Sequence, residues 1–92
     1  MNSPIRPAFD VGRVLLTRGI DALNIPKYDL LWLLRQHVCC QWQMEAEDIH
    51  ANMEAIKQGY RVFGSLVFDR ITIWVITEAD RASTTILLPD EY

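Results

Sequence analysis

Two carboxylates and an arginine lie close together in the last third of the chain. Glu78 and Asp80 are two residues apart, and Arg81 follows directly. In an extended segment, residues two apart point to the same side, so the carboxylates could serve acid/base chemistry or hold a metal ion. A polar connection between two apolar runs is, however, the ordinary composition of a hairpin turn. The sequence therefore favours a solvated hairpin tip in which Arg81 screens the two acids.

Three arginines could join these acids in a nuclease-like site on a sheet. Arg61, Arg70 and Arg81, with Glu78 and Asp80, are the residue types that compact ribonuclease toxins of the RelE or barnase kind use. Such toxins bind a polyanion and are usually basic. This chain has 12 acidic and 9 basic residues, a net charge of −3. The toxin hypothesis stays open as an alternative, resting on Arg61, Glu78 and Arg81.

The sequence gives little support for a metal site or for a catalytic nucleophile. His37, Cys39, Cys40 and His50 are the candidates for soft-metal ligands, but their spacing matches neither CxxC nor HxxxH pairs. Cysteine is commonly buried, so core packing is the expected role. No G-x-S-x-G segment or phosphate-binding glycine loop occurs. We expect no cofactor, no bound metal, no small-molecule substrate and no enzymatic activity.

Length and composition indicate one domain spanning residues 1–92, with half of the residues hydrophobic. The charge is uneven, since residues 1–43 hold five bases and three acids (+2), whereas residues 44–92 hold four bases and nine acids (−5). Seven of the nine bases are arginine, which suits bidentate contacts with carboxylate or phosphate. The chain shows neither a signal peptide nor a run long enough to cross a bilayer, so a cytoplasmic location without a membrane partner is expected.

Hydrophobic periodicity predicts an α+β fold. Residues 71–76 (ITIWVI) are β-branched or aromatic and uncharged, as in a strand covered on both faces. Helical spacing of apolar residues marks the middle of the chain. We predict strands at 11–17, 60–68, 71–76 and 84–88, helical turns at 18–23, and helices from 27 to 39 or 40 and from 45 to 58. The predicted architecture is an antiparallel sheet, a C-terminal three-strand meander plus the N-terminal strand, with two to three helices on one face.

The ending of the chain carries a resemblance. Residues 74–92 read WVITEADRxxTTILLPxEY, residues 5–9 read IRPAF, and Glu47-Asp48, Asn52 and Gly59-x-Arg61 add to the pattern. The chain resembles a family of short proteins carried by plasmids, integrated elements and phages of proteobacteria. Small proteins of this kind often antagonise host defence, and some resemble anti-CRISPR proteins that act on the type I-F surveillance complex.

The resemblance implies a non-enzymatic inhibitor in the host bacterial cytoplasm. It would bind the complex of Cas proteins and guide RNA and block target DNA, with acids mimicking phosphate and arginines contacting guide RNA or acidic protein patches. The residues predicted to bind this partner are Arg13, Trp32, Arg35, Glu47, Asp48, Arg61, Arg70, Glu78, Asp80 and Arg81. A further alternative is a homodimeric accessory protein that pairs through an edge strand, residues 11–16 or 84–88.

Overall fold

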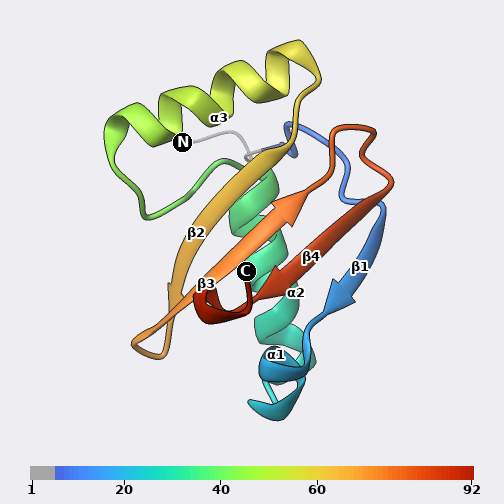
Figure 1. Cartoon of the computed structure of the whole chain (residues 1–92), viewed down its shortest axis with the longest axis vertical. Helices are drawn as coiled ribbons and strands as arrows, with labels where there is room; N and C mark the ends of the chain where they lie inside the picture. Colours follow the sequence, from blue (N-terminus) through green and yellow to red (C-terminus); the bar gives the residue numbers. More distant parts are fainter. Residues whose placement is uncertain (1–5) are drawn as a thin grey trace.

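The computed structural model describes residues 6–92 and contains a four-stranded sheet with three α-helices (Figure 1). The elements in chain order are β1 (Arg13–Leu16), α1 (Arg18–Ala22), α2 (Lys27–Val38), α3 (Ala46–Gln58), β2 (Val62–Phe68), β3 (Ile71–Thr77), β4 (Ser83–Leu87) and the 3-10 turn η1 (Pro89–Glu91). The predicted α+β class and element order are confirmed. In the described part of the chain, the helices are too short or too polar to cross a membrane.

The sheet has the strand order β1-β4-β3-β2. Strands β2, β3 and β4 form the predicted antiparallel meander. The turn between β2 and β3 is made by Asp69 and Arg70, both at positive φ (49° and 67°), as a two-residue hairpin loop requires. Strand β1, in contrast, pairs with β4 in parallel. The sheet is therefore mixed rather than wholly antiparallel, because the three helices carry the chain across the sheet before β2 begins.

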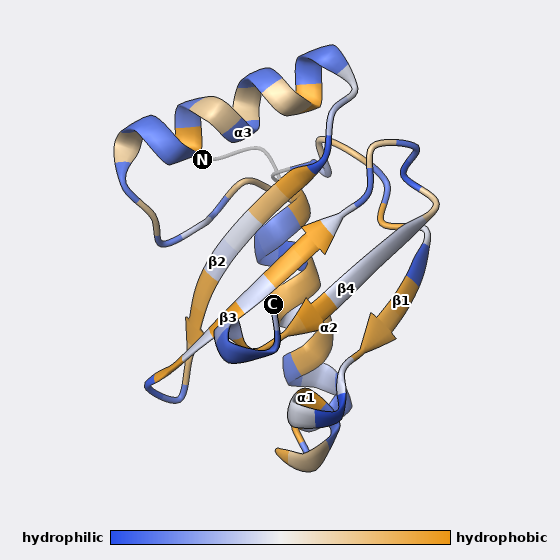
Figure 2. Cartoon of the chain, viewed as in Figure 1, coloured by the Kyte–Doolittle hydropathy of each residue, from blue (hydrophilic) through white to orange (hydrophobic). Residues whose placement is uncertain are grey.

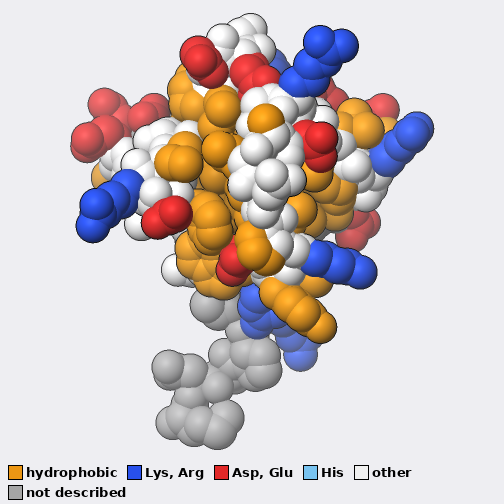
Figure 3. Space-filling model, turned by 90° about the horizontal axis from the view of Figure 1, so that it is seen from below, with side chains coloured by type: hydrophobic (Ala, Val, Ile, Leu, Met, Phe, Trp, Pro, Cys, Tyr) orange, Lys and Arg blue, Asp and Glu red, His pale blue; other side chains and the backbone are white. Residues whose placement is uncertain are grey.

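One face of the sheet holds the hydrophobic core. Val62, Leu66, Ile73, Val75 and Ile86 alternate along β2, β3 and β4 and are almost fully buried. Helix α2 lies behind this face in Figure 1 and contributes Leu33, while α1 contributes Ile20 from the lower end. The hydropathy colouring of Figure 2 follows the same pattern, with apolar segments on the strands and on α2. Viewed from the end that carries α1, hydrophobic side chains lie near the middle of the surface beside backbone and uncharged polar atoms, and most charged side chains lie at the periphery (Figure 3).

A chain of hydrogen bonds runs through this core. The Trp42 indole N–H donates to His37 Nδ1 (2.9 Å), and His37 Nε2 lies 3.0 Å from Thr77 Oγ1. The Thr77 and Thr84 hydroxyls are 2.6 Å apart, and Thr84 donates to the Val11 carbonyl (2.8 Å). Because Nδ1 accepts a hydrogen bond from the Trp42 indole, Nε2 carries the ring hydrogen and donates to the Thr77 hydroxyl. Each side-chain polar atom in this series of hydrogen bonds therefore has a partner, as burial requires.

Gly64 leaves room for the Trp42–His37 pair on the core face of β2. A Cβ at this position would lie 2.6 Å from His37 Nδ1 and would also strike the Trp42 indole. A glycine inside a strand usually weakens it, so this residue marks a close approach of another group. The buried histidine and tryptophan therefore account for a glycine that strand propensity alone would not place there.

The opposite face of the sheet is covered in part by the C-terminal turn. In Figure 1 this turn lies in front of the sheet, on the side away from α2. The Glu91 carboxylate accepts hydrogen bonds from the Thr17 hydroxyl and the Gly19 amide (2.8 Å), which joins the C-terminus to the start of α1. A side chain on Gly19 would collide with this carboxylate. Tyr92 then packs edge-on against Phe63 and Trp74.

The neutral protonation state of the buried His37 makes the free energy of unfolding depend on pH. Burial lowers the pKa of His37 from 6.5 to about 3, so between these values the unfolded chain is protonated while the folded protein stays neutral. Stability must fall as pH falls through this range. We expect the free energy of unfolding in urea to drop by about 1.4 kcal/mol between about pH 7.5 and 5.5.

The same titration in two variants isolates the cause. His50 is exposed on α3, so His50→Gln should keep the pH dependence, whereas His37→Gln should remove most of it. Hydrogen bonds from Thr17 and from the Leu88 and Gly19 amides lower the pKa of Glu91, so its effect appears only at lower pH. Equal stability of the native protein at the two pH values would contradict a neutral buried His37.

Candidate functional site

A hollow of about 850 Å³ opens on the sheet face away from α2. Phe63 and Ser65 of β2 and Trp74 of β3 form its floor, because alternate residues of paired strands share one face. The segment that follows the buried Trp42 forms its wall. The lining residues are Gln43, Met44, Glu45, Asp48, Phe63, Ser65 and Trp74.

Backbone and side-chain contacts hold the wall against the edge of β2. The Gln43 amide donates to the Ser65 carbonyl (2.9 Å), and the Gln43 side-chain oxygen accepts from the Val67 amide (2.6 Å). The Met44 sulfur lies 3.4 Å from the Ser65 amide. From α3, Asn52 both donates to the Phe63 carbonyl (2.8 Å) and accepts from the Phe63 amide (3.2 Å). Side chains thus replace a neighbouring strand along this edge, and the hollow has a fixed wall.

The composition of the hollow suits a cation. Glu45 and Asp48 are exposed at its rim, and its lining includes two aromatic rings but no lysine or arginine. Carboxylates pair with ammonium or guanidinium groups, and aromatic faces attract the same cations. A phosphate group would meet like charge at this rim. The hollow is therefore suited to a lysine or arginine side chain of a partner.

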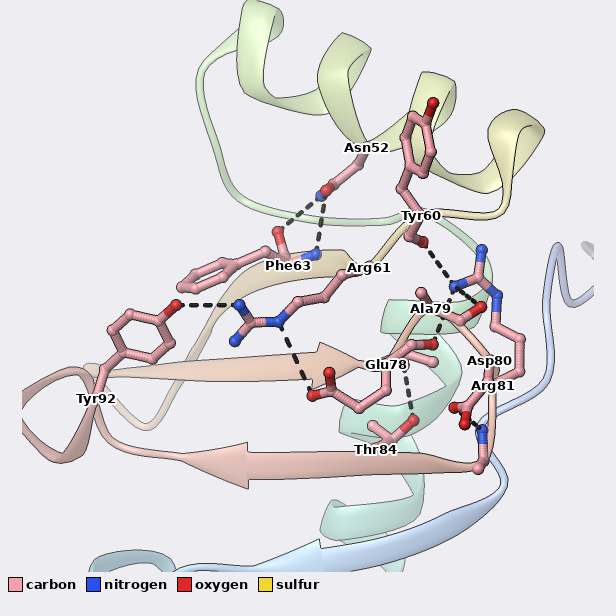
Figure 4. A network of polar contacts seen from close by, with 12 residues as sticks. Asn52, Tyr60, Arg61, Phe63, Glu78, Ala79, Asp80, Arg81, Thr84 and Tyr92 are labelled. Atoms are coloured by element: carbon pink, nitrogen blue, oxygen red, sulfur yellow. Dashed lines mark hydrogen bonds and ion pairs between the residues drawn. The ribbon is translucent and has the colours of Figure 1, made fainter.

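Arg61 lies on the same face of the sheet, beside the rings of Phe63 and Tyr92 (Figure 4). Its guanidinium lies 3.9 Å from the Glu78 carboxylate, donates to the Tyr92 hydroxyl (3.2 Å) and stacks over the Tyr92 ring. Both members of the Arg61–Glu78 pair are almost half exposed. An ion pair in such a setting contributes little to stability, so both side chains are available for contacts with another molecule.

Arg81 and Asp80 play structural roles in the turn between β3 and β4. The Arg81 guanidinium donates to the carbonyls of Tyr60 (2.7 Å), Glu78 (3.1 Å) and Ala79 (3.4 Å) (Figure 4). The Asp80 carboxylate accepts from the Ala82 amide (2.9 Å). The expectation that Arg81 screens Glu78 and Asp80 is wrong, because Arg81 binds carbonyl oxygens and Arg61 is the partner of Glu78.

The residues predicted to bind a partner do not form one surface. Arg61 and Glu78 meet on the face opposite α2, and Asp48 and Glu47 lie in the first turn of α3. Asp80 and Arg81 lie in the turn after β3, whereas Arg70 lies in the turn at the other end of that strand. Arg13 begins β1 at the far edge of the sheet, and Trp32 and Arg35 are exposed on α2, which covers the other face.

The candidate soft ligands are dispersed. His37 is buried with both ring nitrogens hydrogen-bonded, and His50 is exposed on α3. Cys39 is buried and Cys40 half-buried, and they form no disulfide. Burial and the neighbouring Cys39 raise the pKa of the Cys40 thiol. Within residues 6–92, no three His, Cys, Asp or Glu side chains are grouped closely enough to hold a metal ion.

Sequence reasoning missed most of the hollow. Glu45 starts a predicted helix, and no helix or strand is predicted at Gln43 and Met44, whose place beside β2 depends on where Trp42 is buried. Alternation along the strand predicted at 60–68 puts Phe63 and Ser65 on one side, as they are in β2. Pairing of Ser65 with Trp74 across β2 and β3 was the missing information. Tyr92 had no signal beyond its position at the end of the resembling segment.

No family model, curated protein or solved structure matches the chain.

Arg81 and Arg70 offer a matched test of the turn contacts, because both are turn arginines at positive φ (60° and 67°). We expect Arg81→Ala to lower the free energy of unfolding by about 2 kcal/mol, since it removes charge-assisted hydrogen bonds to four carbonyls, those of Tyr60, Glu78 and Ala79 and, at 3.5 Å, that of Ala55. Arg70→Ala should change it by less than about 0.5 kcal/mol. Urea unfolding monitored by tryptophan fluorescence measures both, and equal effects would show that the carbonyl contacts contribute nothing specific.

Proposed function

We propose that this protein is a non-enzymatic inhibitor that binds a basic surface of a host defence ribonucleoprotein. The observation that carries the proposal is the hollow, with carboxylates of Glu45 and Asp48 at its rim and the rings of Phe63 and Trp74 in its floor. A lysine or arginine of the partner that normally contacts a nucleic-acid phosphate would instead bind a carboxylate and an aromatic ring in the hollow. Occupation of such cations excludes the nucleic acid by direct competition.

The charge distribution supports the same mode of action. The C-terminal half carries a net charge of −5 and supplies most of the hollow. A segment of net negative charge is attracted to the basic channel of a nucleic-acid-binding complex, and this attraction accelerates association. Arg61, beside the hollow, can contact an acidic group or guide RNA at the border of that channel. Arg13 and Arg35 lie elsewhere on the molecule, so they would contact a different part of the partner.

The partner that we propose is the type I-F surveillance complex of Cas proteins and guide RNA, bound in the host cytoplasm. The support for this choice is the resemblance of the chain ending to proteins of mobile elements. Such a complex exposes rows of lysine and arginine to receive target DNA, which are the groups that the hollow fits. The mechanism requires only binding, without cofactor or substrate turnover.

The test is competition with target DNA. Purified protein is incubated with a type I-F complex, and binding of a fluorescent target duplex is followed by anisotropy, with co-elution followed by gel filtration. We expect the native protein to co-elute and displace the duplex. The double variant Glu45→Gln with Asp48→Asn should inhibit about tenfold less well, equivalent to about 1.4 kcal/mol.

A control pair separates the hollow from general charge. Glu54→Gln with Asp69→Asn removes the same two charges from exposed positions outside the hollow, and inhibition should change less than about twofold. Equal weakening by both pairs would overturn the role of the hollow. Absence of co-elution, with full DNA binding at saturating protein, would overturn the proposed partner.

A ribonuclease toxin is the second candidate, because the exposed Arg61 side chain contacts both the Glu78 carboxylate and the Tyr92 hydroxyl. Arg81, the third residue of this hypothesis, binds backbone carbonyls instead. Induced expression in a bacterium tests the idea. Growth arrest with RNA cleavage, relieved by Glu78→Ala, would favour the toxin, and normal growth with intact RNA would contradict it.

A further inference from the structure

The two edges of the sheet differ in how their backbone groups are satisfied. Along β2, side chains of Gln43, Met44 and Asn52 pair with the amides and carbonyls of alternate residues. Strand β1 forms the other edge and lies at the margin of the molecule in Figure 1. Proteins usually cover or charge an edge strand, because an open edge is a template for another strand. An open β1 therefore needs an explanation.

The geometry of β1 shows which groups face outward. The amides of Arg13 and Thr17 donate to the Ala82 and Ile86 carbonyls of the β4 segment. Because backbone groups alternate along a strand, the amides and carbonyls of Val14 and Leu16 point away from β4. Within residues 6–92, these outward groups form no hydrogen bond. They can receive one further strand.

The side chains of this edge are apolar and exposed. Val14, Leu15 and Leu16 have 38%, 41% and 40% of their surface accessible. The β1 arrow is coloured as hydrophobic in Figure 2, at the margin of the sheet. No lysine or proline interrupts the strand. Hollows of about 250 and 320 Å³ flank it beneath the sheet, one lined by Leu16 and Leu30 and the other by Val11 and Leu31.

We propose that β1 pairs antiparallel with β1 of a second copy and joins two four-stranded sheets into one of eight strands. The outward groups fix the register. Val14 lies opposite Leu16 of the second copy, which gives four backbone hydrogen bonds, and the two copies of Leu15 face each other on the two-fold axis.

A second copy fits this edge for three reasons. The apolar segment is complementary to itself, since each aliphatic side chain meets another across the axis. In this register Arg13 lies opposite Thr17, so the two Arg13 side chains do not repel each other. Strand pairing alone buries less than a stable interface needs, and the flanking hollows and the exposed Leu31 (49%) supply further apolar area.

The dimer does not rest on the proposed function. The hollow lies beside β2, at the edge of the sheet opposite β1, so both hollows of a dimer stay accessible. Two binding faces on one particle would raise the avidity for a partner with repeated basic sites. The closing experiment measures association of the protein with itself, and its outcome is separate from that of the DNA competition.

Light scattering coupled to gel filtration, from about 10 to 300 µM chain, tests the dimer. We expect the native protein to have twice the mass of one chain. Leu15→Lys and Leu15→Glu place like charges opposite each other on the axis, so each variant alone should be monomeric. An equimolar mixture of the two variants should restore the dimer, because the charges are then opposite.

Val67→Lys is the matched control, since Val67 is equally exposed (42%) but its amide is already bound by Gln43. This variant should remain dimeric. A monomeric native protein at the highest concentration would overturn the proposal. A dimer that survives Leu15→Lys, or variants that stay monomeric when mixed, would overturn the register.

Discussion

The hydrogen-bond network from Trp42 through His37, Thr77 and Thr84 to Val11 connects elements that are far apart in the sequence. It joins α2, the segment after it, the paired ends of β3 and β4, and the residues that lead into β1. A polar chain inside an apolar core is stable only when each donor has an acceptor, and here the direction of donation is fixed from end to end. The requirement keeps His37 neutral and excludes a side chain at position 64.

The position of the candidate site depends on this hydrogen-bond network, because the residues that follow Trp42 in the sequence form the wall of the hollow. Once Trp42 is anchored in the core, Gln43 and Met44 must pass along the edge of β2, where their polar atoms meet the strand backbone. Helix α3 then begins beside the sheet, so that Glu45 and Asp48 stand over Phe63 and Trp74. The same contacts that protect the edge from other strands therefore build the wall of the hollow. The opposite edge has no such cover, and its exposed aliphatic residues remain available to a second strand.

The arginines divide between structure and surface. Arg81 binds carbonyls of its own turn and of the segment before β2, which stabilises a backbone at positive φ. Arg61 instead sits in a partly exposed ion pair with Glu78 on the face that carries the hollow. A planar guanidinium can bridge several carbonyl oxygens at once, which explains why arginine suits the turn. Charge alone could not distinguish these two roles.

The sequence by itself determined the class of the fold, the order of the elements and most of their limits. Periodicity of apolar residues predicted these elements, and the predicted limits leave Gly59 after the helix and Asp69 and Arg70 between two strands. Such signals are local, so they can be interpreted without knowledge of the rest of the chain. Only the tertiary structure decided that β1 lies parallel to β4, that Arg61 rather than Arg81 meets Glu78, and that the connector beside Trp42 forms a wall over two aromatic residues. These features depend on contacts between residues that lie far apart in the sequence, from 17 positions for Arg61 and Glu78 to 70 for Arg13 and Ser83. No local pattern encodes such contacts, because they form only when distant strands and segments pack together.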